Sequence, residues 1–311
     1  MIHIACCTNE KLAPIFGVVV TSVGINVTSD DVTIHLLHNS LRSRTVKRLQ
    51  KIAAKYKVDL DLKQIDTDIL KDFYFDKSKH YGNVMMFARL LLSSVLPDLD
   101  KIIYLDCDIV VLNDLQSLWN FDVSDVAVAM APDFYYRDKA TLERLGIISG
   151  YYLNSGVIVM NLDYWRKHDV QNRIFSYILE KGDKLIYNDQ DALNSVLQNE
   201  RKELHIKYNF SYFYFHRLIG VSHNEKIHEI IEARDNPVIF HYLGQLKPWS
   251  LGSYLPGKEL FIKYQKLSGW NYKIYQKHIF KRIIYTLIPM LKSKMWENKT
   301  YIEGWENYYK E

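Results

Sequence analysis

Two aspartates one residue apart carry the clearest chemical signal in the sequence. Asp106 and Asp108 follow the apolar run 102–105 in the segment KIIYLDCDIVV. In an extended backbone alternate side chains share a face, so both carboxylates point the same way while Cys107 points opposite. Two carboxylates on one face repel each other, and a hard divalent cation, which takes oxygen ligands, removes that repulsion. This DxD pattern therefore predicts a metal site, although a strand that runs into an acidic loop would give the same letters.

A second polar cluster, FHYLGQLKPW at 240–249, offers groups that could complete such a site. The imidazole of His241 joins two carboxylates on Mn2+ more readily than on Mg2+, which prefers oxygen ligands. Gly244 allows the backbone to approach an anion closely, and Lys247 offers a point charge for phosphate. Taken alone, such a histidine is more often a satisfied core residue, but the aspartate pair favours the metal interpretation.

Three further polar groups could meet at the same site. Arg89 lies in an otherwise apolar helical stretch, where arginine usually pairs with a carboxylate or a phosphate. Residues 154–156 (Asn-Ser-Gly) suit sugar hydroxyls, or they form a turn that enters a strand. Residues 189–191 (Asp-Gln-Asp) could face a sugar ring, or they form the capped start of a helix.

The elements that must position these groups alternate between strand and helix. Apolar runs and helical spacing predict strands at 2–7, 31–39, 58–66, 101–105, 126–132 and 152–162, with helices at 12–27, 41–57, 83–97 and 187–198. This order predicts an α/β fold with a mostly parallel sheet and right-handed crossovers. The aspartate pair then falls at the carboxyl end of a strand, where open α/β sheets bind ligands. The aromatic run 208–215 is expected to be core rather than a sugar-stacking wall.

Composition limits the class of protein. The chain has 311 residues, 48% of them apolar and 24% charged, which is enough for one large or two modest globular domains. Residues 258–311 hold 11 basic against 5 acidic side chains, which leaves 29 against 31 for residues 1–257. A net charge of +4 is too small to imply a nucleic-acid partner, and the basic character lies in the C-terminal tail.

Cysteine usage and apolar runs indicate the compartment. The three cysteines lack the spacing of zinc sites or a disulfide framework, so a reducing environment fits. The start of the chain lacks a basic and apolar leader, and no stretch approaches 18 uncharged apolar residues, so neither a secretory signal nor a membrane span is expected. We therefore expect a cytoplasmic protein.

The tail segment KHIFKRIIYTLIPMLKSKMW at 277–296 combines an apolar helical stripe with lysines and arginines around it, interrupted by Pro289. This composition suits an anionic membrane surface, where it would hold the protein at the inner face of the cell membrane. A helix packed on the rest of the chain or on a dimer partner is the alternative.

Four motifs in this order and spacing resemble glycosyltransferase family 8: YLDCDIVVLNDLQSLW, YLNSGVIVMNLDYWR, YNDQDALN and HYLGQLKPW. The resemblance covers residues 1–257 and implies the GT-A fold, in which a Rossmann-like nucleotide-binding half and an acceptor-binding half share one central mixed sheet. Residues 258–311 would form a separate, basic, helical tail. The resemblance implies a retaining enzyme that moves galactose or glucose from a UDP-sugar. Its acceptor would be a saccharide or lipid-linked saccharide of a cell-surface glycan such as lipopolysaccharide or capsule.

The resemblance also implies roles for individual residues. Asp106, Asp108 and His241 look like the ligands of Mn2+, with Mg2+ possible. Asp189 and Gln190 match the pair beside the reacting carbon, where Gln190 would lie on the β face of the sugar. The residues expected to contact the donor are Cys7, Thr8, Asn9, Arg89, Asp106, Cys107, Asn154, Ser155, Asp189, Gly244 and Lys247.

The reaction course follows from the residue types. A double displacement would need a carboxylate nucleophile on the β face, and Gln190 is a poor nucleophile. We therefore expect front-face attack, in which the departing phosphate oxygen takes the proton of the acceptor. Two other interpretations remain: DCDIV also satisfies the motif of haloacid-dehalogenase-type phosphatases, which normally opens its domain, and the chain could bind a sugar nucleotide without transferring it.

Overall fold

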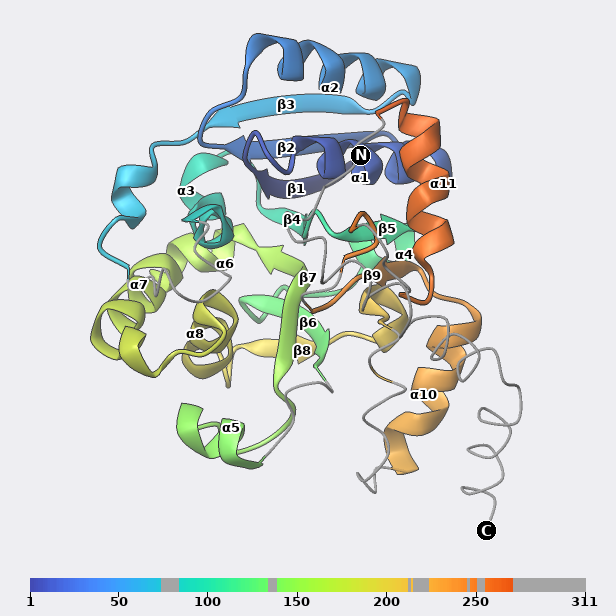
Figure 1. Ribbon diagram of the computed structural model, residues 1–311. Helices are drawn as coiled ribbons and strands as arrows, with labels where there is room; N and C mark the ends of the chain where they lie inside the picture. The colour runs from blue at the N-terminus through green and yellow to red at the C-terminus, as the bar shows by residue number, and fades with distance from the viewer. Residues whose placement is uncertain are drawn as a thin grey trace, which may run out of the picture.

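In the part of the chain that the computed structural model describes, seven strands form one mixed sheet, in the order β3-β2-β1-β4-β7-β6-β8 (Figure 1). Buried apolar side chains form one core on each face of this sheet, so helices protect both faces from water. The residues that the structure describes are 1–73, 84–133, 139–211, 214, 224–244, 247–250 and 255–270.

The first half of the sheet is parallel and follows the strand and helix repeat that the sequence predicts. Its elements are β1 (Ile2–Thr8), α1 (Ala13–Asn26), β2 (Val32–His38), α2 (Ser43–Lys55), β3 (Asp59–Gln64) and β4 (Lys101–Leu105). β2 and β3 extend the sheet on one side of β1, and β4 pairs with its other side. The strand order therefore reverses between β1 and β4, and such a reversal opens a ligand crevice at the carboxyl ends of the two strands.

The second half of the sheet introduces antiparallel pairs. β7 (Leu153–Asn161) runs antiparallel to β4, β6 (Val128–Pro132) runs antiparallel to β7, and β8 (Arg201–Glu203) pairs in parallel with β6. Because β7 is antiparallel, its start lies beside the end of β4. The N–H of Asp106 donates to the carbonyl of Gly156 at 2.8 Å, which places residues 154–156 next to the aspartate pair.

A second, two-stranded sheet joins distant parts of the chain. β5 (Ile109–Val111) follows closely after β4 and pairs antiparallel with β9 (Ile239–His241). In this register Ile109 lies opposite His241. The pairing carries His241 to the aspartates although more than a hundred residues separate them in sequence.

The remaining helices support the sheets and the site. In chain order they are η1 (Thr67–Leu70), η2 (Val84–Leu91), α3 (Leu92–Val95), α4 (Gln116–Trp119), α5 (Lys139–Leu145), α6 (Leu162–Lys167), α7 (Val170–Lys181), η3 (Gly182–Lys184), α8 (Asn188–Val196), η4 (Ile206–Asn209), α10 (Asn224–Asp235) and α11 (Lys258–Ser268). The helix predicted over 83–97 is a 3-10 helix followed by one α-helical turn, and it ends before Pro97. In the aromatic run 208–215, the described residues Tyr208, Phe210 and Tyr214 are buried, as expected for core.

The first part of the predicted tail packs on the rest of the protein. α11 lies along α1, with Phe261 and Tyr264 buried (Figure 1). Lys55, at the end of α2, donates to the carbonyl of Leu267 at 3.0 Å. Such contacts satisfy carbonyl groups at the end of a helix that have no partner within it. The folded part of the chain therefore continues past the boundary expected at residue 257.

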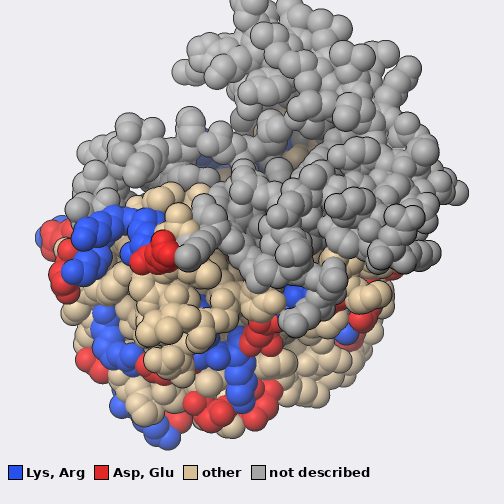
Figure 2. All heavy atoms as spheres, turned by 90° about the horizontal axis from the view of Figure 1, so that it is seen from below, with Lys and Arg blue, Asp and Glu red and all other residues tan. Residues whose placement is uncertain are grey.

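Residues 271–311 lie outside the described residues, and with them the segment 277–296, so membrane binding by the tail stays a prediction. Within the described ranges, no helix combines the length and hydropathy that a membrane span requires. On the described part of the surface in Figure 2, Lys and Arg side chains lie interspersed with Asp and Glu side chains. This mixed surface agrees with the nearly balanced charge of residues 1–257.

Candidate active site

Asp106 and Asp108 lie on the turn between β4 and β5 rather than within one extended strand. The turn still brings both carboxylates toward one point, while Cys107 faces inward and its Sγ donates to a carbonyl of β1 at 3.3 Å. Oδ1 of Asp106 accepts hydrogen bonds from Nη2 of Arg89 and from the hydroxyl of Tyr104, each at 2.8 Å. The first carboxylate of the pair is therefore held in one orientation.

His241 reaches the same point from β9. Its Nε2 lies 3.3 Å from Oδ1 of Asp108 and 4.0 Å from Oδ2 of Asp106. One donor atom from each of the three residues lies within 4.8 Å of the other two. Two carboxylates and one imidazole at such distances form a donor set that fits a divalent cation. The structure thus brings together the three side chains that the sequence predicts as metal ligands.

Lys247 lies against this group. Its Nζ donates to Oδ2 of Asp108 at 2.5 Å and to the carbonyl of Tyr242 at 2.8 Å. Burial alone would raise the pKa of Asp108, but the ammonium of Lys247 outweighs that effect and holds the pKa well below its usual range. Gly244, before the lysine, has a φ of +80°, a conformation that glycine adopts without strain.

Arg89 is the buried cation of the site, with a side chain only 6% exposed. Besides its bond to Asp106, its Nε lies 3.0 Å from Oδ2 of Asp189, and its Nη1 donates to the carbonyl of Ser155 at 2.5 Å. The guanidinium carbon lies 4.4 Å from the ring centre of Tyr104. The prediction that Arg89 pairs with a carboxylate is confirmed, and the pairing links β4, β7 and α8.

Asp189 lies in the first turn of α8 and is 2% exposed. Its Oδ2 is within ion-pair distance of Arg89, yet no hydrogen bond from the described residues reaches that oxygen. Burial raises the pKa of Asp189 to about 6, because the guanidinium of Arg89 offsets only part of the cost of burying a charge. This oxygen can therefore still accept a hydrogen bond from a ligand.

The amide of Gln190 is held at both ends. Its Oε1 accepts from the N–H of Ser155 at 2.9 Å and from the hydroxyl of the same residue at 3.2 Å. Its Nε2 donates to Oδ2 of Asp133 at 3.1 Å. Gln190, on α8, is therefore a neutral side chain that is held in one orientation against the start of β7.

Asn154 is buried on β7 and makes polar contacts in two directions. Its Nδ2 donates to Oδ2 of Asp133 at 2.8 Å, and its Oδ1 accepts from Nδ2 of Asn209 at 2.8 Å. Sequence reasoning missed both of these partners. Asp133 directly follows a fully buried strand, which is the signal that identified Asp106, whereas Asn209 follows no such pattern.

Asp191, the third residue of the run 189–191, is held by hydrogen bonds within the protein. It is fully buried and accepts from the hydroxyl of Tyr152 at 2.6 Å, from Nη1 of Arg144 at 3.0 Å, and from the N–H groups of Ile186 and Tyr187 at 2.8 and 3.1 Å. These bonds fix the loop before α8. Asp191 therefore stabilises the loop at the start of α8, in keeping with the helix-start alternative for residues 189–191.

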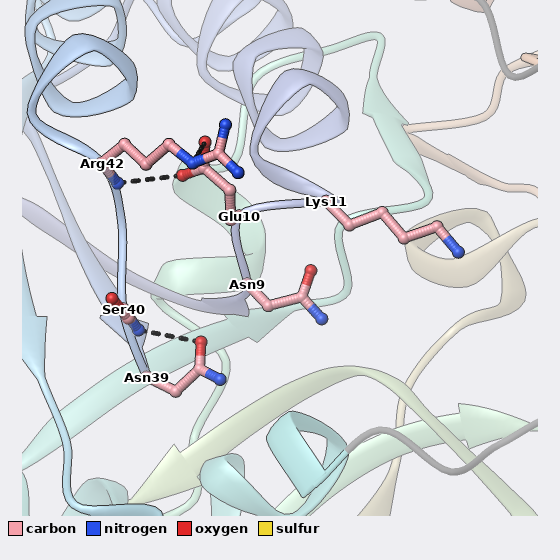
Figure 3. Close-up of a pocket in the computed structure, with 6 residues that line it drawn as sticks. All are labelled: Asn9, Glu10, Lys11, Asn39, Ser40 and Arg42. Carbon is pink, nitrogen blue, oxygen red and sulfur yellow. Dashed lines mark hydrogen bonds and ion pairs between the residues drawn. The ribbon is translucent and has the colours of Figure 1, made fainter.

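The end of β1 lies on the other side of the point where the strand order reverses. Thr8 is buried, and burial raises the pKa of Cys7 to about 12, so this thiol stays protonated. Beyond it, a pocket lies where β1 and β2 end, and it is lined by Asn9, Glu10, Lys11, Asn39, Ser40 and Arg42. In Figure 3, Glu10 and Arg42 lie close together and Lys11 points away from them.

Known proteins resemble the chain over most of its length. General stress protein A of Bacillus subtilis is 26% identical over 277 residues, which cover 87% of this chain and 95% of that protein. A lipopolysaccharide 1,2-glucosyltransferase of Escherichia coli is 29% identical over 269 residues, which cover 84% of this chain and 77% of the relative. The crystal structure of the galactosyltransferase LgtC with donor and acceptor sugar analogs superposes with a TM-score of 0.77 at 22% identity. That superposition covers 89% of this chain and 98% of LgtC.

The family assignment rests on a match along most of the sequence. Residues 3–251 match the family model described as glycosyl transferase family 8. This match overturns the phosphatase interpretation of DCDIV, which also disagrees with the complete strand and helix repeat that precedes the motif. The shared architecture is the GT-A fold that the sequence predicts. The chain therefore belongs to glycosyl transferase family 8 and is a glycosyltransferase.

Proposed function

We propose that the protein is a retaining glycosyltransferase that moves a hexose from a UDP-sugar to a saccharide acceptor of a cell-surface glycan. The observation that carries this proposal is the convergence of Asp106, Asp108 and His241 just after β4, where the strand order reverses. The names of the relatives support the substrate class, since one is a lipopolysaccharide glucosyltransferase and another a galactosyltransferase.

We propose Mn2+ as the cofactor, with Mg2+ as a possible substitute, because the donor set includes an imidazole. Asp106, Asp108 and His241 would hold the ion. When bound, it supplies Lewis-acid stabilisation of the charge that develops on the UDP leaving group.

Lys247 and Gly244 are the proposed contacts of the diphosphate. The ammonium of Lys247 is partly exposed, with 24% of the side chain accessible, and needs only to turn from Asp108 to reach a bound anion. The positive φ of Gly244 lets the backbone approach that anion without a side chain in between. The uridine would lie along Cys7, Thr8 and Asn9, toward the pocket in Figure 3.

The donor sugar would lie between α8 and β7. Oδ2 of Asp189 forms an ion pair with Arg89 but accepts no hydrogen bond from the described residues, and sugar hydroxyls are suitable donors for it. Arg89 bridges Asp189 and the carbonyl of Ser155, and we propose Arg89, Ser155, Asn154 and Cys107 as further contacts of the donor. A buried acceptor of this kind discriminates strongly against sugars that leave it unpaired.

The proposed course is front-face attack. The acceptor oxygen forms a bond to the anomeric carbon as the bond from that carbon to the phosphate oxygen breaks, and the departing phosphate oxygen takes the acceptor proton. Gln190 supports this course because its amide is neutral and already holds two partners. Asp191 is not available as a nucleophile because its hydrogen bonds hold the loop before α8.

The acceptor is proposed to be a saccharide or lipid-linked saccharide, handled in the cytoplasm at the inner face of the membrane. A chain that ends after Trp270 keeps α11 and tests whether the remaining residues are needed there. We expect it to lose sedimentation with anionic vesicles and to keep UDP-sugar hydrolysis. Vesicle binding that survives this truncation would remove the tail from the proposal.

A panel of UDP-sugars, scored for UDP release with Mn2+ and with chelator, tests the function. We expect release from UDP-galactose or UDP-glucose that depends on Mn2+ and rises with a saccharide acceptor. Tight UDP binding without transfer or slow hydrolysis of any donor would support the sugar-nucleotide-binding alternative instead.

A further inference from the structure

The ring of His241 is buried and has a defined neighbour on each side. It is 3% exposed, with Nδ1 at 2.8 Å from Oδ1 of Asn209 and Nε2 facing Asp106 and Asp108. A cation ligand must present a lone pair. Which ring nitrogen carries the proton therefore decides whether Nε2 can serve as a ligand.

A backbone amide fixes the direction of the hydrogen bonds that reach this ring. The N–H of Gly156 can only donate, so the Asn154 atom that it reaches at 2.9 Å is the carbonyl Oδ1. The same Oδ1 lies 2.8 Å from Asn209, which therefore presents its Nδ2 there. Oδ1 of Asn209 is left facing His241, so Nδ1 of the ring must carry the proton.

A series of hydrogen-bonded side chains runs from His241 through Asn209 and Asn154 to Asp133. The last bond in this series agrees with the same direction. Nδ2 of Asn154 donates to Oδ2 of Asp133, and a carboxylate only accepts. Asp133 and Asn209 are 1% and 0% exposed, so water competes poorly for these bonds. Each amide in the series thus has one orientation, and neither can turn without leaving a buried group unpaired.

The position of the ring is set by close packing as well. A Cβ atom at Gly156 would lie 2.1 Å from Cε1 and 2.7 Å from Nδ1 of His241. Both distances are far shorter than van der Waals contact, so the ring can occupy its place only because residue 156 has no side chain. Gly156 therefore both donates the hydrogen bond that directs the series and makes room for the ring of His241.

We propose that Asp133, Asn154 and Asn209 are positioning residues that hold His241 in the tautomer with the proton on Nδ1 and the lone pair on Nε2. The lone pair then faces the two aspartates and is ready for a divalent cation before the ion arrives. The opposite tautomer would direct an N–H group at the ion. The proposal rests on the proposed metal-dependent function only for the identity of what Nε2 binds.

The tautomer can be read directly in the metal-free protein. Long-range proton–nitrogen NMR correlations of protein with 15N-labelled histidine distinguish the two ring nitrogens, and His241→Gln identifies the signals. At alkaline pH we expect the proton on Nδ1 in the wild-type chain and a mixed or reversed tautomer in Asn209→Leu. A proton on Nε2 in the wild-type protein would overturn the proposal, and this measurement needs no variant that could misfold.

Mn2+ binding measures the consequence. With UDP present, free Mn2+ is followed by its EPR signal. We expect Asn209→Leu to bind Mn2+ about 10- to 100-fold more weakly, as loss of a hydrogen-bond partner of a ligating histidine usually does. Asn209→Asp keeps an acceptor oxygen opposite Nδ1 but loses the amide donor to Oδ1 of Asn154, so it should retain more affinity than Asn209→Leu without reaching the wild-type value. The matched control is Asn161→Ala, which removes side-chain bonds at the other end of β7 and should leave the affinity unchanged.

The outcomes separate the inference from the proposed function. Wild-type Mn2+ affinity in Asn209→Leu would overturn the positioning role. An equal loss of Mn2+ affinity in the Leu and Asp variants, with intact circular dichroism, would also overturn it, because the loss would then depend on side-chain shape and not on the acceptor oxygen. If the wild-type chain itself binds no Mn2+, the proposed cofactor fails, and the NMR measurement alone decides the tautomer.

Discussion

Two Asp-x-Asp triplets with identical spacing have opposite arrangements in this protein. In Asp106-Cys107-Asp108, a turn between strands brings both carboxylates near one imidazole, and the middle residue faces the core. In Asp189-Gln190-Asp191, the first turn of a helix separates the carboxylates, because residues two apart on a helix are rotated by about 200°. Gln190, the middle residue of this second triplet, reaches Ser155 at the start of β7. The spacing of charges therefore acquires chemical meaning only through the backbone that carries it.

The largest effect is expected from Asp108→Asn in the first triplet. This change removes a charged oxygen next to His241 and Lys247, and we expect Mn2+-dependent UDP release to fall at least about a thousandfold. Far-UV circular dichroism and a cooperative melt would show that the variant is folded. Near-normal release would remove the metal site from this account.

Asp191→Asn should have the converse effect, a loss of stability with little loss of chemistry. Asp191 is 0% exposed and paired with Arg144, and breaking a buried ion pair costs about 3 to 5 kcal/mol. Urea unfolding measures this cost, and turnover at low temperature should stay within a few-fold of wild type. A stable but inactive variant would mean that both triplets serve the reaction.

Gln190→Ala tests the middle residue of the second triplet. The amide is expected to position the donor, so its loss should lower turnover about a hundredfold while the product stays α-linked. Product linkage is read by NMR, and intact-mass spectrometry of the enzyme with donor detects covalent adducts. A glycosyl group on Asp189 would establish double displacement in place of front-face attack.

The smallest effect concerns Asp189 and pH. Its pKa is raised to about 6 in the folded protein, so the native state binds this proton more tightly than the unfolded chain does. Its contribution to stability is therefore complete below the unfolded value of 3.8 and is lost as the pH rises through about 6. The slope in that window is at most about 1.4 kcal/mol per pH unit for one proton.

Comparison with Asp189→Asn isolates this contribution from other titrating groups. Urea unfolding at several pH values between the two pKa values should give a difference curve that falls with rising pH. A flat difference curve would mean that Asp189 is ionised throughout this pH range.

The sequence was most informative where local pattern and site coincide. The strand and helix repeat predicted the first half of the sheet, and the end of a buried strand located Asp106 and Asp108. His241 was predicted from its residue type together with the aspartate pair and the family resemblance, and the structure places it beside that pair.

Residues whose role depends on tertiary pairing could not be predicted in this way. Asn209 contacts His241 only because η4 lies beside β9. Asp133 contacts Asn154 only because β6 runs antiparallel to β7. The sequence left two roles open for Asp191, because its donors, such as Tyr152 and Arg144, come from segments whose approach to α8 no local pattern encodes. In each case a local sequence pattern does not reveal which strands and loops are neighbours in the fold.

The pairing of β5 with β9 has a consequence for how the protein assembles. Asp106 and Asp108 lie close together in the chain, but His241 joins them only when the C-terminal part of the fold has docked. A ligand that needs all three groups binds the native state, in which β9 has paired with β5, and does not bind an intermediate that lacks this pairing. By mass action it therefore stabilises the native state. Occupancy of this site would thus report completed folding, and it would protect β9 from local opening more than it protects the early strands.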